Sequence, residues 1–363
     1  MKVMVSSSEM TNLLNSWYVM IRDRNVEKAF KLKEEIDEKI NNMEENQNLL
    51  LYYSLLTFRY NLIHSKTMQD ADLLMFEIDQ GKNEMDDMLE YYYHFFKGIY
   101  LYKQKNYEDA LAHFHYAEKK LTSIPDPIET AEFHYKLASV YSQHMNILNS
   151  IQHTFKGLEI FQTDEHYHSR TADCKNLLGT NYILLGNYKR AEYYLNKALK
   201  YAQLLKCLET ESVSLQNLGW MYSKMGESNK AIEYLENSLT WMVENNQYHY
   251  QVKTMYIMAK EYFRLRQVDH AMYWVTQCYD VCRHTQDSEY LGKLNILKAK
   301  HTLNLQDYMY ILREEISSFL DKKYWGNLEE FSQELAKYYE QERNIEEAMK
   351  YYKLVIHAKN KLS

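Results

Sequence analysis

The sequence predicts an all-α protein built from a helical hairpin that is repeated about seven times. Of its 363 residues, only 2 are proline and 9 are glycine, so few residues interrupt helices. No segment alternates apolar and polar residues for long enough to predict a β-strand. A small residue recurs at intervals of about 40 residues, at Gly98, Ala138, Gly179, Gly219, Ala259, Ala299 and Ala336. A period of this length predicts a stack of antiparallel helix pairs.

Three amphipathic stretches precede the repeats, and we expect them to form a three-helix bundle within residues 1–66. Asn25 and the pair Asn41-Asn42 mark the breaks between them. Residues 67–84 are expected to form a connector that contains a short helix from Ala71 to Ile78. The apolar stripes follow the spacing of one helix face and consist of Met10, Leu13, Leu14, Trp17 and Ile21, then Ala29, Leu32, Ile36 and Ile40, then Leu49, Tyr52, Tyr53, Leu56, Tyr60 and Ile63.

The remaining residues, 85–363, carry a fuller pattern around each small residue. In the third repeat, Gly179 is followed by Tyr182 and then by Ala191, Leu195 and Ala198. This order resembles the tetratricopeptide repeat, in which two helices cross closely where one side chain is small and an aromatic ring fills the space beside it. We therefore expect a superhelix of about seven repeats, with a long groove suited to binding a peptide.

Composition argues against several classes of function. The net charge is −7 with both signs interspersed, which argues against nucleic acid as a partner. No run of about 18 apolar residues predicts a membrane span, and the opening MKVMVSSSEM does not resemble a signal peptide. The four cysteines lack the spacing of a metal site, so we expect free structural thiols, no metal and a cytoplasmic protein.

Four segments resemble the Rap family along essentially the whole chain. They read SSSEMTNLLNSWYVMIR from Ser6, MEENQNLLLYYSL from Met43, LEYYYHFFKG from Leu89 and AKYY from Ala336. Rap proteins are response-regulator aspartate phosphatases and related regulators of sporulating Gram-positive bacteria. The resemblance implies a bundle that binds a response-regulator receiver domain and a repeat domain that binds a short imported signalling peptide, which inhibits the protein.

The resemblance also implies a catalytic residue, Gln47, at the start of the third helix. Its amide is expected to orient water for attack on the aspartyl phosphate of the receiver. The regulator supplies the magnesium, so the chain needs no cofactor of its own. Such chemistry is plausible because an acyl phosphate is already reactive and a neutral amide does not repel it.

Four neighbours of Gln47 are expected to contact the receiver. Glu45 and Asn46 precede it, and several relatives carry an acidic residue where this chain has Asn46. Leu50 and Phe58 follow it as apolar candidates, although both fit the core of the bundle equally well.

In the repeats, Asn181 and Asn217 match asparagines that the family uses to hold the peptide backbone. An asparagine amide suits this role because it offers a donor and an acceptor together. Trp220 lies one turn from Asn217 and is expected to pack on the peptide or on a neighbouring helix. Lys260 and Lys293 make the predicted groove basic. We therefore expect a peptide without an essential arginine, which binds through an acidic residue or its C-terminal carboxylate.

Three other functions remain open at this stage. The same surface of the bundle could sequester a DNA-binding response regulator without catalysis. A peptide-sensing transcription factor is disfavoured because Arg59 is the only basic residue in the third helix, whereas a recognition helix needs several polar and basic side chains. A repeat scaffold without either activity is the least specific alternative.

Overall fold

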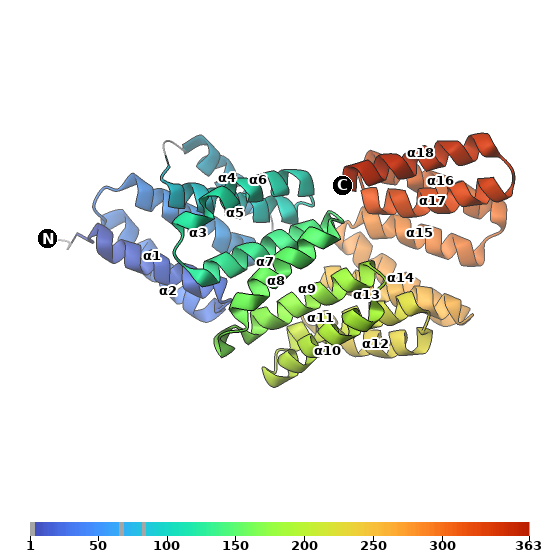
Figure 1. Cartoon of the computed structure of the whole chain (residues 1–363), viewed down its shortest axis with the longest axis horizontal. Coiled ribbons are helices and arrows are strands. Elements are labelled where there is room, and N and C mark those ends of the chain that lie inside the picture. The colour runs from blue at the N-terminus through green and yellow to red at the C-terminus, as the bar shows by residue number, and fades with distance from the viewer. Residues whose placement is uncertain (1–3, 65–68, 82–84, 363) are drawn as a thin grey trace. The chain divides into compact units, whose positions relative to one another are not determined.

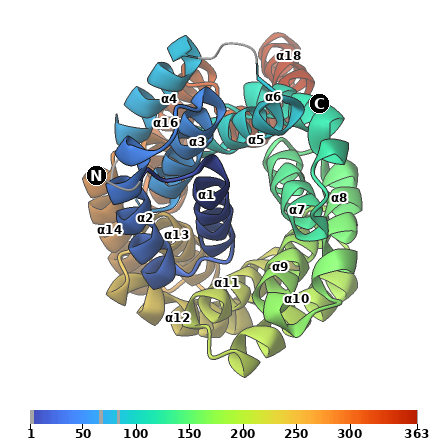
Figure 2. The same ribbon diagram turned by 90° about the vertical axis from the view of Figure 1, so that its left-hand side faces the viewer.

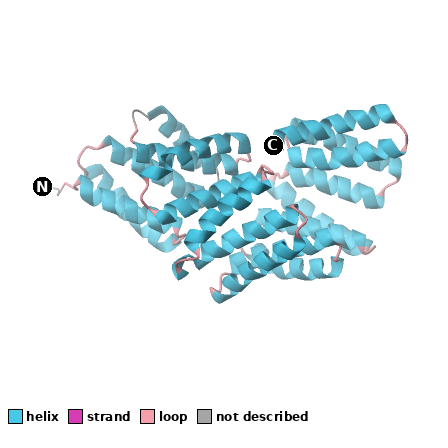
Figure 3. Ribbon diagram, in the orientation of Figure 1, coloured by secondary structure: helices cyan, strands magenta, loops and turns pink. Residues whose placement is uncertain are grey.

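The computed structural model describes residues 4–64, 69–81 and 85–362, and these residues are almost entirely helical (Figures 1 and 3). They form eighteen α-helices, three short 3-10 helices and one isolated β-bridge between Val5 and Met43. The predicted all-α fold is therefore confirmed. The chain divides into two compact units, Met1–Val140 and Tyr141–Ser363.

The first unit contains the bundle and the beginning of the repeats. The three predicted bundle helices are present, and the expected short helix at 71–78 lies within the longer α4. Residues 65–68 and 82–84 of the predicted connector lie outside the described residues. The helices are α1 (Ser7–Arg22), α2 (Val26–Lys39), α3 (Gln47–His64), α4 (Gln69–Gly81), α5 (Asp87–Lys103), α6 (Tyr107–Lys120) and α7 (Pro127–Gln143), the last of which continues into the second unit.

Aromatic side chains join the bundle to α5. The ring of Tyr92 on α5 lies 5.2 Å from that of Tyr18 on α1 and 5.5 Å from that of Tyr52 on α3, centroid to centroid. Buried aromatic pairs of this kind stabilise an interface beyond the area they remove from water. These contacts place the predicted bundle and α5 in one compact unit, which ends at Val140. The predicted domain boundary at residue 66 stays a prediction.

The second unit is a succession of helical hairpins. Figure 2 shows α9, α11 and α13 on the inner side of an arc and α10, α12 and α14 on its outer side. We call the surface formed by the odd-numbered helices of this unit the inner face. The helices are α8 (Ile147–Phe161), α9 (His168–Leu184), α10 (Tyr188–Leu204), α11 (Leu208–Met225), α12 (Ser228–Glu244), α13 (Tyr248–Arg264), α14 (Val268–Thr285), α15 (Ser288–Thr302), α16 (Leu305–Asp321), α17 (Trp325–Gln341) and α18 (Ile345–Leu362).

Each of the seven small residues lies on an odd-numbered helix from α5 to α17, as the period predicted. The glycines mark tight crossings, because an added Cβ at Gly179 would lie 2.4 Å from Leu195 Cδ2 and one at Gly219 would lie 2.6 Å from Leu235 Cγ. Real Cβ atoms do not approach another carbon this closely. The explanation from packing is therefore confirmed at these crossings.

The aromatic residue of the pattern stacks on the next helix of its own hairpin. Three repeats show the same parallel pair of tyrosine rings, with centroids 5.4 to 5.8 Å apart. Such offset stacking adds to the energy of burial and leaves each hydroxyl free to reach a polar group. The pairs are Tyr182–Tyr194, Tyr222–Tyr234 and Tyr339–Tyr351.

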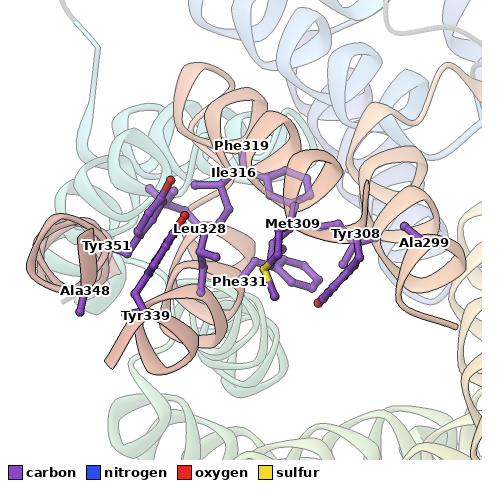
Figure 4. Packing of buried hydrophobic residues seen from close by; sticks show 14 of the residues in the cluster. Ala299, Tyr308, Met309, Ile316, Phe319, Leu328, Phe331, Tyr339, Ala348 and Tyr351 are labelled. Carbon is purple, nitrogen blue, oxygen red and sulfur yellow. The ribbon is translucent and has the colours of Figure 1, made fainter. Parts of the chain in front are cut away.

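The last two hairpins share one apolar core (Figure 4). Phe319 of α16 stacks on Phe331 of α17 with centroids 5.7 Å apart, and Leu328 and Ile316 lie beside them. Tyr351 of the final helix extends the same cluster to α18. This packing holds α17 and α18 against the preceding repeat.

Candidate functional site

Gln47 is the first residue of α3, and its side chain is exposed. The residue before it, Asn46, caps the helix, since its Oδ1 accepts a hydrogen bond from the Leu49 amide at 3.1 Å. The amide of Gln47 itself has no hydrogen-bond partner among the described residues. It lies beside the positive end of the α3 dipole, where an anion such as a phosphoryl group is favoured.

The loop in front of Gln47 is fixed by the N-terminal segment. Val5 donates its amide to Asn42 O at 3.0 Å and accepts from the Glu44 amide at 3.1 Å. The Glu44 carboxylate in turn accepts from both the amide and the hydroxyl of Ser7, each at 3.1 Å. Glu45 is exposed and points to no partner among the described residues. The loop is therefore held at both ends while Glu45 stays accessible.

The two apolar candidates of α3 occupy different environments. Leu50 is 43% exposed, one turn after Gln47. Phe58 has no exposed surface, and its ring packs 5.6 Å from that of Tyr100 on α5. In this structure Phe58 is a core residue, so we withdraw it as a receiver contact and keep Leu50.

A buried polar network connects α1 to α7, and no pattern in the sequence predicts it. Glu129 is fully buried and accepts hydrogen bonds from the hydroxyls of Tyr18 and Tyr91, with oxygen–oxygen distances of 2.7 to 2.8 Å. Arg22 lies 3.3 Å from Glu129 and donates to Asp126 at 2.6 Å. Burial raises the pKa of Glu129, whereas the guanidinium and the two hydroxyls oppose that shift. The network fixes the end of α1 against the start of α7.

The two predicted peptide asparagines also differ. Asn181 is fully buried, and its amide is used at both ends, accepting from Ser142 Oγ and donating to Ser150 Oγ, each at 2.8 Å. Asn217 is 5% exposed, and its side chain makes no hydrogen bond to any described residue. Asn217 is therefore ready to bind a ligand, whereas Asn181 would first have to break two internal bonds.

The predicted tryptophan and lysines lie together on α11, α13 and α15. Asn217, Trp220 and Lys224 occupy positions i, i+3 and i+7 of α11, which share one helix face. Lys260 lies on α13 and Lys293 on α15. A further lysine, Lys253, lies over the Trp220 ring at 4.7 Å. Its position seven residues before Lys260 was the signal that could have identified it.

All four cysteines are free thiols, and Cys174, Cys278 and Cys282 are buried. Among the described residues no helix is both long and apolar enough to cross a membrane.

Comparison with known proteins identifies the family. Residues 4–65, which include Gln47, match a family described as "response regulator aspartate phosphatase H, N terminal". Residues 172–203, 213–241 and 330–361 match the tetratricopeptide repeat. The chain belongs to the Rap family.

Full-length relatives of this Rap-family chain carry several functional names. Response regulator aspartate phosphatase I of Bacillus subtilis (strain 168) is 29% identical over 97% of this chain and 91% of its own length. Regulatory protein RapF of the same strain is also 29% identical, over 96% and 93%. Transcriptional activator NprA of Geobacillus stearothermophilus is 28% identical, over 95% and 86%. The names thus include phosphatases and regulators of transcription.

Two solved Rap structures extend over nearly the whole chain. A Rap protein complexed with Competence and Sporulation Factor superposes with a TM-score of 0.88 at 27% identity, covering 98% of this chain and 99% of that one. The apo form of RapI superposes with a TM-score of 0.66 at 29% identity, covering 97% and 98%.

Proposed function

We propose that this Rap-family chain binds a response-regulator receiver domain and hydrolyses its aspartyl phosphate, and that a short peptide on the inner face inhibits it. The observation that supports the catalytic part is the exposed, unpaired amide of Gln47 at the first turn of α3, inside the segment that matches the phosphatase family. Receiver domains act in the cytoplasm, where free thiols such as those of this chain persist.

The proposed chemistry needs only positioning. The Gln47 carbonyl accepts a hydrogen bond from a water molecule and directs its oxygen at the phosphorus, in line with the bond to the aspartyl oxygen. That bond breaks, and the products are a free aspartate carboxylate and inorganic phosphate. The magnesium ion of the receiver neutralises the developing charge. Orientation of this kind can contribute several kcal/mol, on the order of 10²-fold or more in rate.

The receiver contacts that we propose are Gln47, Glu45 and Leu50, which share the exposed start of α3 and the loop before it. Asn46 contributes by capping the helix, so its amide fixes the direction of the first turn. An aspartate there would cap equally well, which explains how this position can tolerate the exchange.

A time course of phosphate loss from a panel of phosphorylated receiver domains tests this proposal. We expect one or more receivers to lose phosphate faster with the wild-type protein than alone, and the Gln341→Ala variant, which removes an exposed glutamine from α17, to behave like the wild type. No acceleration with any receiver that binds would contradict catalysis.

Sequestration of a DNA-binding regulator is the second candidate function, because relatives of similar identity are named regulatory protein RapF and transcriptional activator NprA. Sequestration predicts that a receiver binds tightly and keeps its phosphate, or that the DNA-binding domain of a regulator binds tightly. The same time course, run beside a binding measurement, separates the two functions.

A further inference from the structure

Four lysines belong to the helices of the inner face. Lys224 of α11, Lys253 and Lys260 of α13 and Lys293 of α15 form no hydrogen bond or ion pair with any described residue. Lys253, Lys260 and Lys293 are each half-buried, so water screens them incompletely. Unpaired ammonium groups held together in this way cost stability, unless a ligand neutralises them.

Aromatic rings hold two of these ammonium groups in place. The Lys253 Nζ atom lies 4.7 Å from the centre of the Trp220 ring. Lys293 Nζ lies between two rings, 4.8 Å from that of Tyr256 and 4.6 Å from that of Tyr290. The ring faces attract the cations and restrict their positions, but they do not cancel a full charge.

Burial and mutual repulsion both act on the charged form of these lysines. Burial, followed by repulsion from Lys293, lowers the pKa of Lys253 to about 8. Burial also lowers the pKa of Lys260, where Lys224 and Arg264 add repulsion. Three carboxylates, those of Glu330, Glu289 and Asp287, act favourably on Lys293, but none of them forms an ion pair with it. Burial therefore weakens the charged form of these lysines, and a carboxylate bound directly to them would stabilise it.

We propose that Lys253 and Lys293 form a subsite for a carboxylate of a short bound peptide, and that Asn217, one turn from the Trp220 ring that Lys253 covers, binds the peptide backbone. The proposal rests on the proposed function, because it assumes that a peptide binds to the inner face. The carboxylate of that peptide is inferred from the lysines alone. Either an acidic side chain or the C-terminus can supply the carboxylate. A backbone amide of the peptide pairs with Asn217, whose donor and acceptor are both available.

Synthetic peptide pools test the subsite directly. Pentapeptides with Glu, Gln or Lys at the middle position and uncharged residues elsewhere are prepared with free or amidated C-termini. The amount that the full-length protein retains through gel filtration is measured by mass spectrometry. We expect at least tenfold greater retention of pools that carry a carboxylate than of the amidated Gln pool. The amidated Glu pool and the free-acid Gln pool identify which carboxylate is bound.

Charge variants show whether the lysines are responsible. The double variant Lys253→Met/Lys293→Met should retain carboxylate pools within twofold of the amidated Gln pool, because its side chains keep the volume and lose the charge. Lys197→Met is the matched control, since Lys197 also lies over a tyrosine ring but on the exposed surface of α10. Circular dichroism verifies that each variant is folded, and the single variant Lys293→Gln replaces the double one if that unfolds.

Three results would overturn the subsite: greatest retention of the amidated Lys pool, equal or no retention of all pools, or wild-type retention of acidic pools by the folded charge variants. The outcome is independent of catalysis. If the protein binds acidic peptides but dephosphorylates no receiver, the subsite stands and the phosphatase activity is contradicted. If it dephosphorylates a receiver but does not select carboxylates, the phosphatase activity stands and the subsite is contradicted.

Discussion

Replacement of Asn181 by alanine should destabilise the fold, whereas replacement of Asn217 by alanine should weaken peptide binding. The family resemblance gives both residues the same role. Asn181→Ala removes two buried hydrogen bonds of 2.8 Å and leaves the hydroxyls of Ser142 and Ser150 without those partners. At about 1–2 kcal/mol for each hydrogen bond lost between buried groups, we expect a loss of about 2–4 kcal/mol. Asn217→Ala removes no internal bond, so its stability should change by less than about 0.5 kcal/mol.

Thermal unfolding followed by circular dichroism and peptide binding by calorimetry separate the two variants. For a unit of this size, each kcal/mol shifts the midpoint by about 2–4 °C, so Asn181→Ala should melt several degrees lower than the wild type. Asn217→Ala should melt with the wild type and bind peptide at least about tenfold more weakly, as expected for the loss of one or two hydrogen bonds. A destabilised Asn217→Ala, or a stable Asn181→Ala that no longer binds peptide, would refute this reasoning.

Three other perturbations test the packing and the charges. Gly179→Ala should lower the melting temperature, because a Cβ 2.4 Å from Leu195 costs about 1–3 kcal/mol, whereas Gly326→Ala, with open space around it, should raise stability by up to about 1 kcal/mol. Peptide affinity should be constant between about pH 6 and 7, where the peptide carboxylate is ionised, and should fall above about pH 8 as Lys253 loses its proton; a flat profile to pH 10 in calorimetry would count against the subsite. Glu129→Gln should cost about 1–3 kcal/mol in urea unfolding, since it removes one of the two acidic partners of buried Arg22 and leaves only Asp126, and a neutral effect would contradict the network.

The repeat architecture could be predicted because each tight crossing depends on residues close in sequence. Gly179 and Leu195 belong to one hairpin, so the period of small and large residues alone predicts their contact. The environments of Leu50 and Phe58 could not be separated in the same way. Neither residue belongs to the predicted apolar stripe of this helix, and apolar residues outside that stripe lie both in the core, as Leu55 does, and at the surface.

Long-range polar contacts lie beyond what the sequence pattern predicts. Glu129 follows a proline in the first turn of α7, where an acidic residue normally faces solvent, yet its partners Tyr18 and Tyr91 lie 111 and 38 residues away. Lys253 likewise gains its significance from Trp220, which belongs to the preceding repeat. The sequence shows that Lys253 and Lys260 are seven residues apart, but only the structure shows that they form no ion pair with any described residue.

The central claim is that the neutral amide of Gln47 orients the attacking water, and a single-turnover measurement tests it most directly. Phosphate release from a bound, phosphorylated receiver is followed with wild-type protein, Gln47→Ala and Gln47→Glu, each at saturating concentration, with receiver affinity measured separately. We predict release that is at least about 10²-fold slower for both variants, with the affinity of Gln47→Ala unchanged, because positioning alone is lost. Release at the wild-type rate by Gln47→Ala would contradict the account.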